Sequence, residues 1–246
     1  MSDLGLQVLH RDADFLVVCK PAGLPTTSTD GGDCLAERVW ALDPQAPRLH
    51  PSSRLDMDVT GVVTFARSRA ATLALQEARA EGRYMRCYVA LAQGSPANGE
   101  GTVEAAIGVS TRDGRLRQVV PSGERDAQAA VTRYRVQAKA GSVGLLWLYP
   151  ETGRTHQLRV HMAHVGCPLL GDRRYGGLSR IVLPSGRVVR AARTMLHCIE
   201  VQVPRLAEGG NLRFSAPIPR DFLKAWQALG GAQDSLEGLV PAAPTA

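Results

Sequence analysis

The sequence is poor in lysine, in aromatic residues and in long apolar runs. Lysine occurs only at Lys20, Lys139 and Lys224, so arginine supplies nearly all of the positive charge, and the formal net charge is +6. Such a balance suits an anionic partner such as nucleic acid, although a coding preference for arginine would explain it equally well. No apolar run approaches the roughly 20 residues that span a bilayer, and no basic-then-apolar leader opens the chain. We therefore expect a soluble, cytoplasmic protein without a membrane partner.

Cysteine is also sparse, and its spacing fits neither a disulfide framework nor a zinc site. The five cysteines are scattered and odd in number, and no Cys-x-x-Cys pair occurs, which favours reduced thiols. Three histidines, His156, His161 and His164, lie close together, but no Glu or Cys accompanies them in the same run. We therefore expect no metal site and no cofactor.

The apolar pattern predicts a chain made mostly of strands, with three or four helices set between them. Helices are expected where apolar residues recur at helical spacing, at residues 34–42, 70–81 and 156–165. Strands are expected in the alternating or continuously apolar runs at residues 6–10, 15–19, 62–66, 84–93, 102–107, 115–120, 129–136, 143–149 and 195–203. Because strands and helices do not alternate regularly, this order indicates an α+β fold rather than repeated βαβ units.

Two segments stand apart from the expected core. Residues 181–189 resemble a small hairpin around Pro184-Ser185-Gly186, and residues 231–246 are rich in Ala, Gly and Pro, which predicts a disordered tail. The length of 246 residues suits either one large domain or two small ones.

The strongest indication of chemistry comes from two polar segments that lie far apart in the chain. Residues 53–61 read Ser-Arg-Leu-Asp-Met-Asp-Val-Thr-Gly and place Asp56 in a loop just before an apolar strand. Residues 152–161 read Thr-Gly-Arg-Thr-His-Gln-Leu-Arg-Val-His, which is dense in fixed hydrogen-bond donors. Together the two segments could build a carboxylate held by guanidinium groups, which is an arrangement that keeps a carboxylate ionised.

This pair of segments resembles the signature of the RluA-type pseudouridine synthase family. Residues 166–176, Gly-Cys-Pro-Leu-Leu-Gly-Asp-Arg-Arg-Tyr-Gly, and residues 14–24, Asp-Phe-Leu-Val-Val-Cys-Lys-Pro-Ala-Gly-Leu, are similar to two further motifs of that family. The resemblance runs from about Leu6 to Phe222. It implies a mixed, mostly antiparallel β-sheet flanked by helices, with an active-site cleft across the sheet. It also implies one catalytic domain over residues 1–230, with no RNA-binding domain in front of it.

The resemblance implies an isomerase that converts uridine in RNA to pseudouridine. The reaction breaks the N-glycosidic bond, turns the base and rejoins it through C5, so it requires no metal or redox cofactor. By the resemblance, Asp56 is the catalytic nucleophile and Arg159 is its basic partner. Tyr88 matches the family's active-site tyrosine and can stack on a flipped base or assist removal of the C5 proton. Arg159 could instead contact phosphate at the surface or simply solvate the helix, and Tyr88 could instead fill a half-buried strand position.

The remaining candidate site residues are arginines expected to contact RNA. Arg54 matches the arginine that takes the place of the uridine when it swings out, although a simple phosphate contact would also explain it. Arg154 is assigned to phosphate binding or support. Arg115 and Arg117 lie where relatives carry a mobile loop that grips RNA, but a solvated hairpin would have the same composition. Ser53 departs from the family, which has histidine there, and so the RNA contact at that position is expected to differ.

Two other interpretations compete with an RNA uridine isomerase. A catalytically inactive, RNA-binding relative of the same fold would have lost at least one of Asp56, Tyr88 and Arg159, and all three are present. A glycoside hydrolase could use Asp56 with Asp58, but that class favours aromatic sugar platforms and this chain is only 5% aromatic. The expected partner is structured ribosomal or transfer RNA, and the expected oligomeric state is a monomer.

Overall fold

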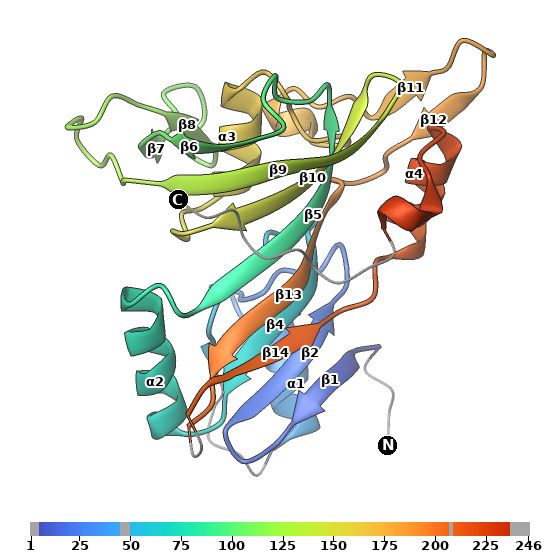
Figure 1. Ribbon diagram of the computed structural model, residues 1–246. Coiled ribbons are helices and arrows are strands. Elements are labelled where there is room, and N and C mark those ends of the chain that lie inside the picture. The colour runs from blue at the N-terminus through green and yellow to red at the C-terminus, as the bar shows by residue number, and fades with distance from the viewer. Residues whose placement is uncertain (1–4, 45–49, 207–208, 237–246) are drawn as a thin grey trace. The chain divides into compact units, whose positions relative to one another are not determined.

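The computed structural model describes residues 5–44, 50–206 and 209–236 (Figure 1). The chain divides into two compact units, each made of two stretches of sequence. Unit one comprises residues 1–86 and 198–218, and unit two comprises residues 87–197 and 219–246. Within the described residues, no helix is long and apolar enough to cross a membrane.

Unit one is built on a sheet whose central strands are buried along nearly their whole length. Its strands are β1 (Gln7–Arg11), β2 (Phe15–Lys20), β3 (His50–Pro51), β4 (Thr60–Ala66), β13 (Leu196–Pro204, which begins in unit two) and β14 (Asn211–Ser215). Their order is β1-β2-β4-β13, with β14 paired to β13 and β3 paired to β4. Every residue of β4 is buried, as expected for a strand covered on both faces.

Two helices belong to unit one, α1 (Leu35–Leu42) and α2 (Arg69–Ala80). The start of α2 is capped by Ser68, whose side-chain oxygen accepts a hydrogen bond from the Ala71 N–H at 3.0 Å. Ala71, Leu75 and Ala78 recur at helical spacing and form its buried face.

Gly61, in the motif that follows Asp56, has a structural reason to be glycine. Its φ of +120° is rarely adopted by L side chains, and a Cβ atom would lie 2.1 Å from the carbonyl oxygen of Cys198. The close approach of β4 to β13 at this point therefore excludes any side chain.

Unit two is built on a second run of strands in the order β5-β10-β9-β6. These strands are β5 (Met85–Gln93, which begins in unit one), β6 (Glu100–Glu104), β9 (Val131–Ala140) and β10 (Val143–Pro150). All eight residues of β10 are buried between β5 and β9, with which it pairs antiparallel. Helix α3 (Gln157–His164) follows β10 in the chain.

The rest of unit two consists of two small hairpins, two 3-10 turns and one helix. They are β7 (Ile107–Val109) paired with β8 (Arg117–Val119), η1 (Arg173–Tyr175), β11 (Arg180–Val182) paired with β12 (Val188–Arg190), α4 (Arg220–Ala228) and η2 (Gln233–Ser235).

The predicted α+β class and the mostly antiparallel sheet are confirmed. The strand expected at residues 102–107 is instead two strands, because the chain leaves β6 after Glu104 and starts β7 at Ile107. Strand β14 and helix α4 were not predicted. Of the tail predicted to be disordered, residues 233–235 form η2, and residues 237–246 lie outside the described residues.

Candidate active site

The Asp56 loop is held from both sides of the aspartate. Thr26 makes two hydrogen bonds to Leu55: its hydroxyl donates to the Leu55 carbonyl at 2.7 Å and accepts from the Leu55 N–H at 3.0 Å. On the other side, the Met57 carbonyl accepts from Lys20 Nζ at 2.9 Å and from the Gly23 N–H at 3.0 Å. The half-buried Asp56 therefore sits on a backbone whose neighbouring residues are both tied to the segment that follows β2.

Lys20 is the buried anchor of this arrangement. Its side chain is fully buried, and Nζ donates to three carbonyls, those of Pro21, Leu24 and Met57, at 2.6–2.9 Å. An ammonium group withdrawn from water is stable only if its donors are satisfied, and carbonyl oxygens satisfy them here. The Lys-Pro-Ala-Gly motif thus holds the loop that carries Asp56 through the hydrogen bonds of Lys20.

The other residues of the Asp56 motif differ in exposure. Arg54 is exposed, as a predicted RNA contact requires, whereas Ser53 is buried. Asp58 is exposed, and the Val59 N–H donates to the Asp56 carbonyl at 3.0 Å, which closes a turn around Met57 and Asp58. Asp58 thus lies in a turn, where aspartate is a favoured residue.

Helix α3 is fastened to β9 by its first residue. The buried Gln157 side chain donates from Nε2 to the Val131 carbonyl at 2.9 Å and to Thr132 Oγ1 at 3.0 Å. Its Oε1 accepts from the Thr152 hydroxyl at 2.7 Å and from the Arg154 N–H at 3.0 Å. All of the amide's polar atoms are used, so the Gly-Arg-Thr-His-Gln stretch has a defined shape where it enters the helix.

Arg159 projects from this helix into a bidentate pair with Asp172. Arg159 Nε lies 2.6 Å from Asp172 Oδ2 and Nη2 lies 2.8 Å from Oδ1, and both side chains are buried. The Arg159 guanidinium carbon also lies over the Tyr175 ring, 4.8 Å from its centroid. A planar guanidinium held at one edge and along one face keeps its orientation.

Tyr175 joins three segments of unit two. Its hydroxyl lies 2.7 Å from His156 Nδ1 and accepts a hydrogen bond from the Arg117 N–H at 3.0 Å. His156, just before α3, has a φ of +58°, an uncommon conformation for a residue other than glycine. Tyr175 thus contacts His156 at the start of α3, Arg159 within that helix and Arg117 of strand β8.

Two tyrosines lie at or near β5, and they have different surroundings. Tyr84 precedes the strand and is buried in unit one, where its hydroxyl lies 3.2 Å from Ser52 Oγ and Arg79 lies over its ring. Tyr88 is buried in unit two and pairs in register with Leu148 of β10. Tyr84 therefore has a structural role, and Tyr88 remains the predicted active-site tyrosine.

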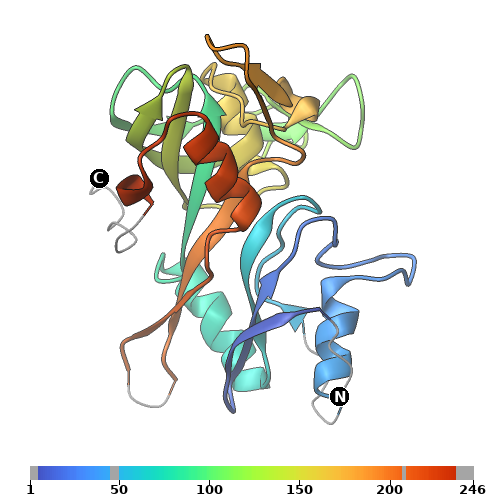
Figure 2. The same cartoon turned by 90° about the vertical axis from the view of Figure 1, so that its right-hand side faces the viewer.

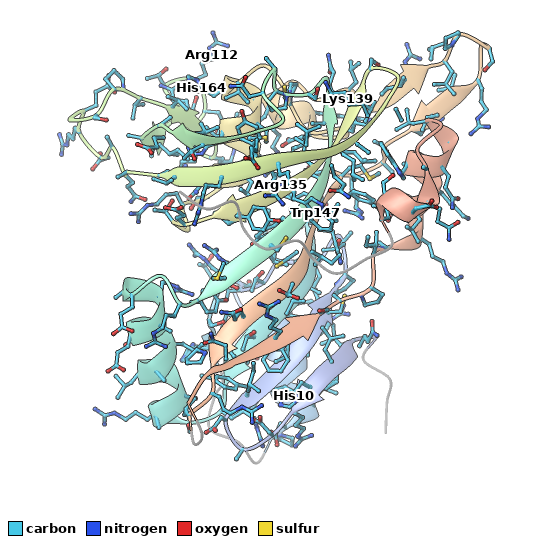
Figure 3. The ribbon with its side chains drawn as sticks, viewed as in Figure 1. His10, Arg112, Arg135, Lys139, Trp147 and His164 are labelled. Atoms are coloured by element: carbon cyan, nitrogen blue, oxygen red, sulfur yellow. The ribbon has the colours of Figure 1, made fainter. Side chains whose placement is uncertain are left out.

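The predicted RNA-contacting arginines of unit two are all partly engaged within the protein. Arg115 forms a bidentate pair with Asp113, and the hydrogen bond from Arg115 is the main cause that lowers the pKa of Asp113 to about 2. Arg117 Nη1 donates to the Gly114 and Leu116 carbonyls, and exposed Arg154 donates from Nε to the Ala129 carbonyl at 3.0 Å. Figure 3 shows Arg112 extending outward from the loop between β7 and β8.

The two histidines of α3 differ in burial and in their contacts. His161 is fully buried, with Nδ1 2.9 Å from Thr132 Oγ1 and Nε2 3.0 Å from the Ala105 carbonyl oxygen. His164, by contrast, is exposed (Figure 3). Within the part of the chain that the structure describes, no three His, Cys, Asp or Glu side chains are grouped so that they could hold a metal ion.

Comparison with known proteins identifies the family. A family model described as RNA pseudouridylate synthase matches residues 14–164, a stretch that includes Asp56, Tyr88 and Arg159. The ribosomal large subunit pseudouridine synthase D of Xanthomonas campestris is 36% identical over 240 residues, which cover 92% of this chain and 70% of the relative. The chain belongs to the RluA-type pseudouridine synthase family. It is therefore an RNA pseudouridine synthase, which is an isomerase.

Two further pseudouridine synthases extend the likeness over almost the full length of each protein. An uncharacterized RNA pseudouridine synthase of Zymomonas mobilis is 34% identical over 226 residues, which cover 90% of this chain and 98% of that one. The structure of human RNA pseudouridylate synthase domain containing 4 superposes with a TM-score of 0.72 at 26% identity, covering 91% of this chain and 93% of the human one.

Four residues that support this candidate site have no predicted catalytic role in the sequence. Asp172 and Tyr175 belong to the motif at residues 166–176, and their contacts with Arg159 show that this motif supports the arginine. Lys20 belongs to the opening motif, where its full burial could not be read from the residues around it. Thr26 follows that motif and carried no signal at all.

Proposed function

We propose that this pseudouridine synthase isomerises specific uridines in ribosomal RNA, with Asp56 as the catalytic nucleophile. The observation that carries the proposal is the rigid mounting of Asp56 by Thr26 and Lys20, in a chain that belongs to this family. A nucleophile must be held close to the geometry in which it reacts, and misplacement of even about 1 Å is costly.

The proposed reaction conserves all atoms of the uridine. The bond between N1 and C1′ of the ribose breaks with the Asp56 carboxylate as nucleophile, and the base turns while it remains in the site. C5 then forms a bond to C1′ as the Asp56 carboxylate leaves that carbon, the proton on C5 is removed, and N1 gains a proton. Tyr88 stacks on the base, and its hydroxyl assists removal of the C5 proton.

The arginines divide into two proposed roles. Arg159 supplies the positive charge that orients the Asp56 carboxylate, for which its own fixed orientation against Asp172 and Tyr175 is suited. Arg54, Arg154, Arg115 and Arg117 bind RNA, and Arg54 fills the space that the target uridine leaves when it swings out of the stack.

Ribosomal RNA is the proposed substrate class because several relatives are named for the large ribosomal subunit, such as those of Xanthomonas campestris and Haemophilus ducreyi. Transfer RNA is the second candidate substrate. We further propose that the protein works as a monomer in the cytoplasm.

The decisive experiment maps pseudouridines across total RNA from cells with and without the gene. The purified protein is then added to RNA from the cells that lack it. We expect at least one ribosomal position to lose its pseudouridine in those cells and to regain it in vitro. If no position changes while the protein still binds RNA, the inactive RNA-binding alternative is correct. If only transfer RNA changes, the catalytic proposal stands and the substrate class is wrong.

A further inference from the structure

The β11–β12 hairpin sets two arginines directly opposite each other. Arg180 pairs in register with Arg190, Ile181 with Val189, and Val182 with Val188. Residues that face each other across an antiparallel pair lie on the same side of the ribbon, and like charges at such positions destabilise it. Both arginines are exposed, and the segment from 173 to 199 contains no Asp or Glu that could lie between them.

The two faces of the hairpin have different environments. On one face, Val189 is buried and Ile181 is half-buried. Strand β12 contacts α4, and Arg187 Nη2 donates a hydrogen bond to the carbonyl of Ala228 in that helix at 3.1 Å. The opposite face carries the Arg180–Arg190 pair together with Val182 and Val188, whose exposed fractions are 63% and 43%. Figures 1 and 2 show the hairpin projecting from unit two beside α4.

The nearby Arg193 shows that the fold does pair arginines where their role is structural. It is buried and forms a bidentate pair with Asp221 of α4, with distances of 2.7 and 3.0 Å. Arg180 and Arg190 are instead left side by side on a solvent-facing surface next to two exposed valines. A phosphate backbone supplies the missing negative charge, and its sugars and bases supply apolar surface for the valines.

We propose that the outward face of the β11–β12 hairpin, formed by Arg180, Val182, Val188 and Arg190, is a docking site for the backbone of the substrate RNA. This site is separate from the arginines of the β7–β8 hairpin and from the catalytic residues. It deepens the proposed function, on which it rests for the nature of the partner. Bound RNA relieves the repulsion between the two arginines. The repulsion that destabilises the free hairpin therefore favours RNA binding.

Arg190→Glu tests this assignment because it affects folding and binding in opposite directions. The new carboxylate faces Arg180 across the strands, so the hairpin gains an ion pair and the melting temperature should stay equal or rise. The RNA backbone no longer has a cation at position 190, and Arg180 becomes engaged within the protein. Binding of ribosomal RNA should therefore weaken. The slope of log K against log salt should become shallower by about 0.7 for each phosphate of single-stranded RNA that the variant no longer neutralises.

The matched control is Arg69→Glu, an equal charge reversal at an exposed position in the first turn of α2, where an acid suits the helix N-terminus. The inference stands if Arg190→Glu weakens RNA binding and raises KM well beyond Arg69→Glu while kcat is retained. It is overturned if both variants bind RNA equally well with equal salt slopes. Failure of the proposed function gives a different result from failure of this inference. In that case the wild-type protein would form no pseudouridine, regardless of how the two variants bind RNA.

Discussion

Arg159 and Asp172 form a bidentate ion pair in the interior of unit two, with Arg159 Nε 2.6 Å from Asp172 Oδ2 and Nη2 2.8 Å from Oδ1. The carboxylate side chain is only 1% exposed, so neither charge has much water to stabilise it. Asp172 thereby fixes the edge of the guanidinium, and Tyr175 fixes its face. The Gly-Asp-x-x-Tyr-Gly motif is thus the support of the arginine that we propose to face Asp56.

Asp172→Asn should destabilise the protein strongly, because the buried Arg159 guanidinium loses the charged partner that binds it bidentately. Removing one partner of a buried pair typically costs about 3–5 kcal/mol. The free energy of unfolding from urea titration measures this cost. Asp221→Asn is the matched control, since it breaks the Arg193 pair at a carboxylate that is 49% exposed and should cost less. Equal losses of unfolding free energy in the two variants would mean that burial does not make the Arg159–Asp172 pair more important for stability than the Arg193–Asp221 pair.

Thr26→Val should reduce turnover more than RNA affinity. The change keeps the side-chain shape but removes both hydrogen bonds to Leu55, which loosens the Asp56 loop and costs about 1–3 kcal/mol of stability. Thr64→Val provides the control, since the buried Thr64 hydroxyl has no hydrogen-bond partner among the described residues and its loss should be neutral or stabilising. Single-turnover rates and binding constants separate the two effects, and an unchanged rate for Thr26→Val would show that the loop needs no such anchor.

His161 should make the protein less stable in acid. Burial is the main cause that lowers the pKa of His161, and the neighbouring His164 lowers it further, whereas the hydrogen bond to Ala105 opposes the shift. Below the ordinary value of about 6.5 the unfolded chain binds a proton that the folded chain refuses, so stability falls as the pH drops through this range.

The melting temperature between about pH 8 and pH 5 checks this expectation. His161→Gln should flatten the acid side of the curve, even if it lowers stability overall. His164→Gln, at an exposed position of the same helix, should leave most of the slope in place. The assignment fails if His161→Gln loses stability in acid as steeply as the wild-type protein.

Asp113→Asn should tighten RNA binding. Arg115 holds the Asp113 carboxylate with its guanidinium and its N–H, and the low pKa of Asp113, about 2, keeps that carboxylate charged throughout the physiological range. Removing the charge releases Arg115 for phosphate. Asp33→Asn frees Arg38 from a similar exposed pair in unit one and serves as the control for net charge. Equal gains for both variants would indicate a general charge effect rather than an RNA contact at Arg115.

Much of the fold was predictable because its strands and helices follow local patterns. The run Phe15–Lys20 and the run Thr60–Ala66 are rich in apolar residues, and they form central strands. Helix α4 was missed although Phe222, Ala225 and Trp226 recur at helical spacing, because the segment follows two prolines and is short. Strand β14 has only one buried residue, Phe214, so its pattern is weak, and its pairing with β13 decides its structure.

The supports of the candidate site were less predictable, because they depend on contacts between distant residues. Thr26 lies 29 residues from Leu55, and Lys20 lies 37 residues from Met57. Nothing in the local sequence distinguishes a lysine whose donors reach three carbonyls from one on the surface. The motifs predict which residues matter, and the hydrogen bonds show how the segments that carry them are held.

The central claim is that the Asp56 carboxylate carries out the chemistry, and Asp56→Asn tests it most directly. The variant keeps the size of the side chain and loses its negative charge and nucleophilicity. Melting temperature, RNA affinity and pseudouridine formation are measured on the same preparation, with Asp58→Asn as the neighbouring control. We expect a folded protein that binds RNA and forms no detectable pseudouridine, while Asp58→Asn remains active. Turnover at the wild-type rate by Asp56→Asn would contradict the account.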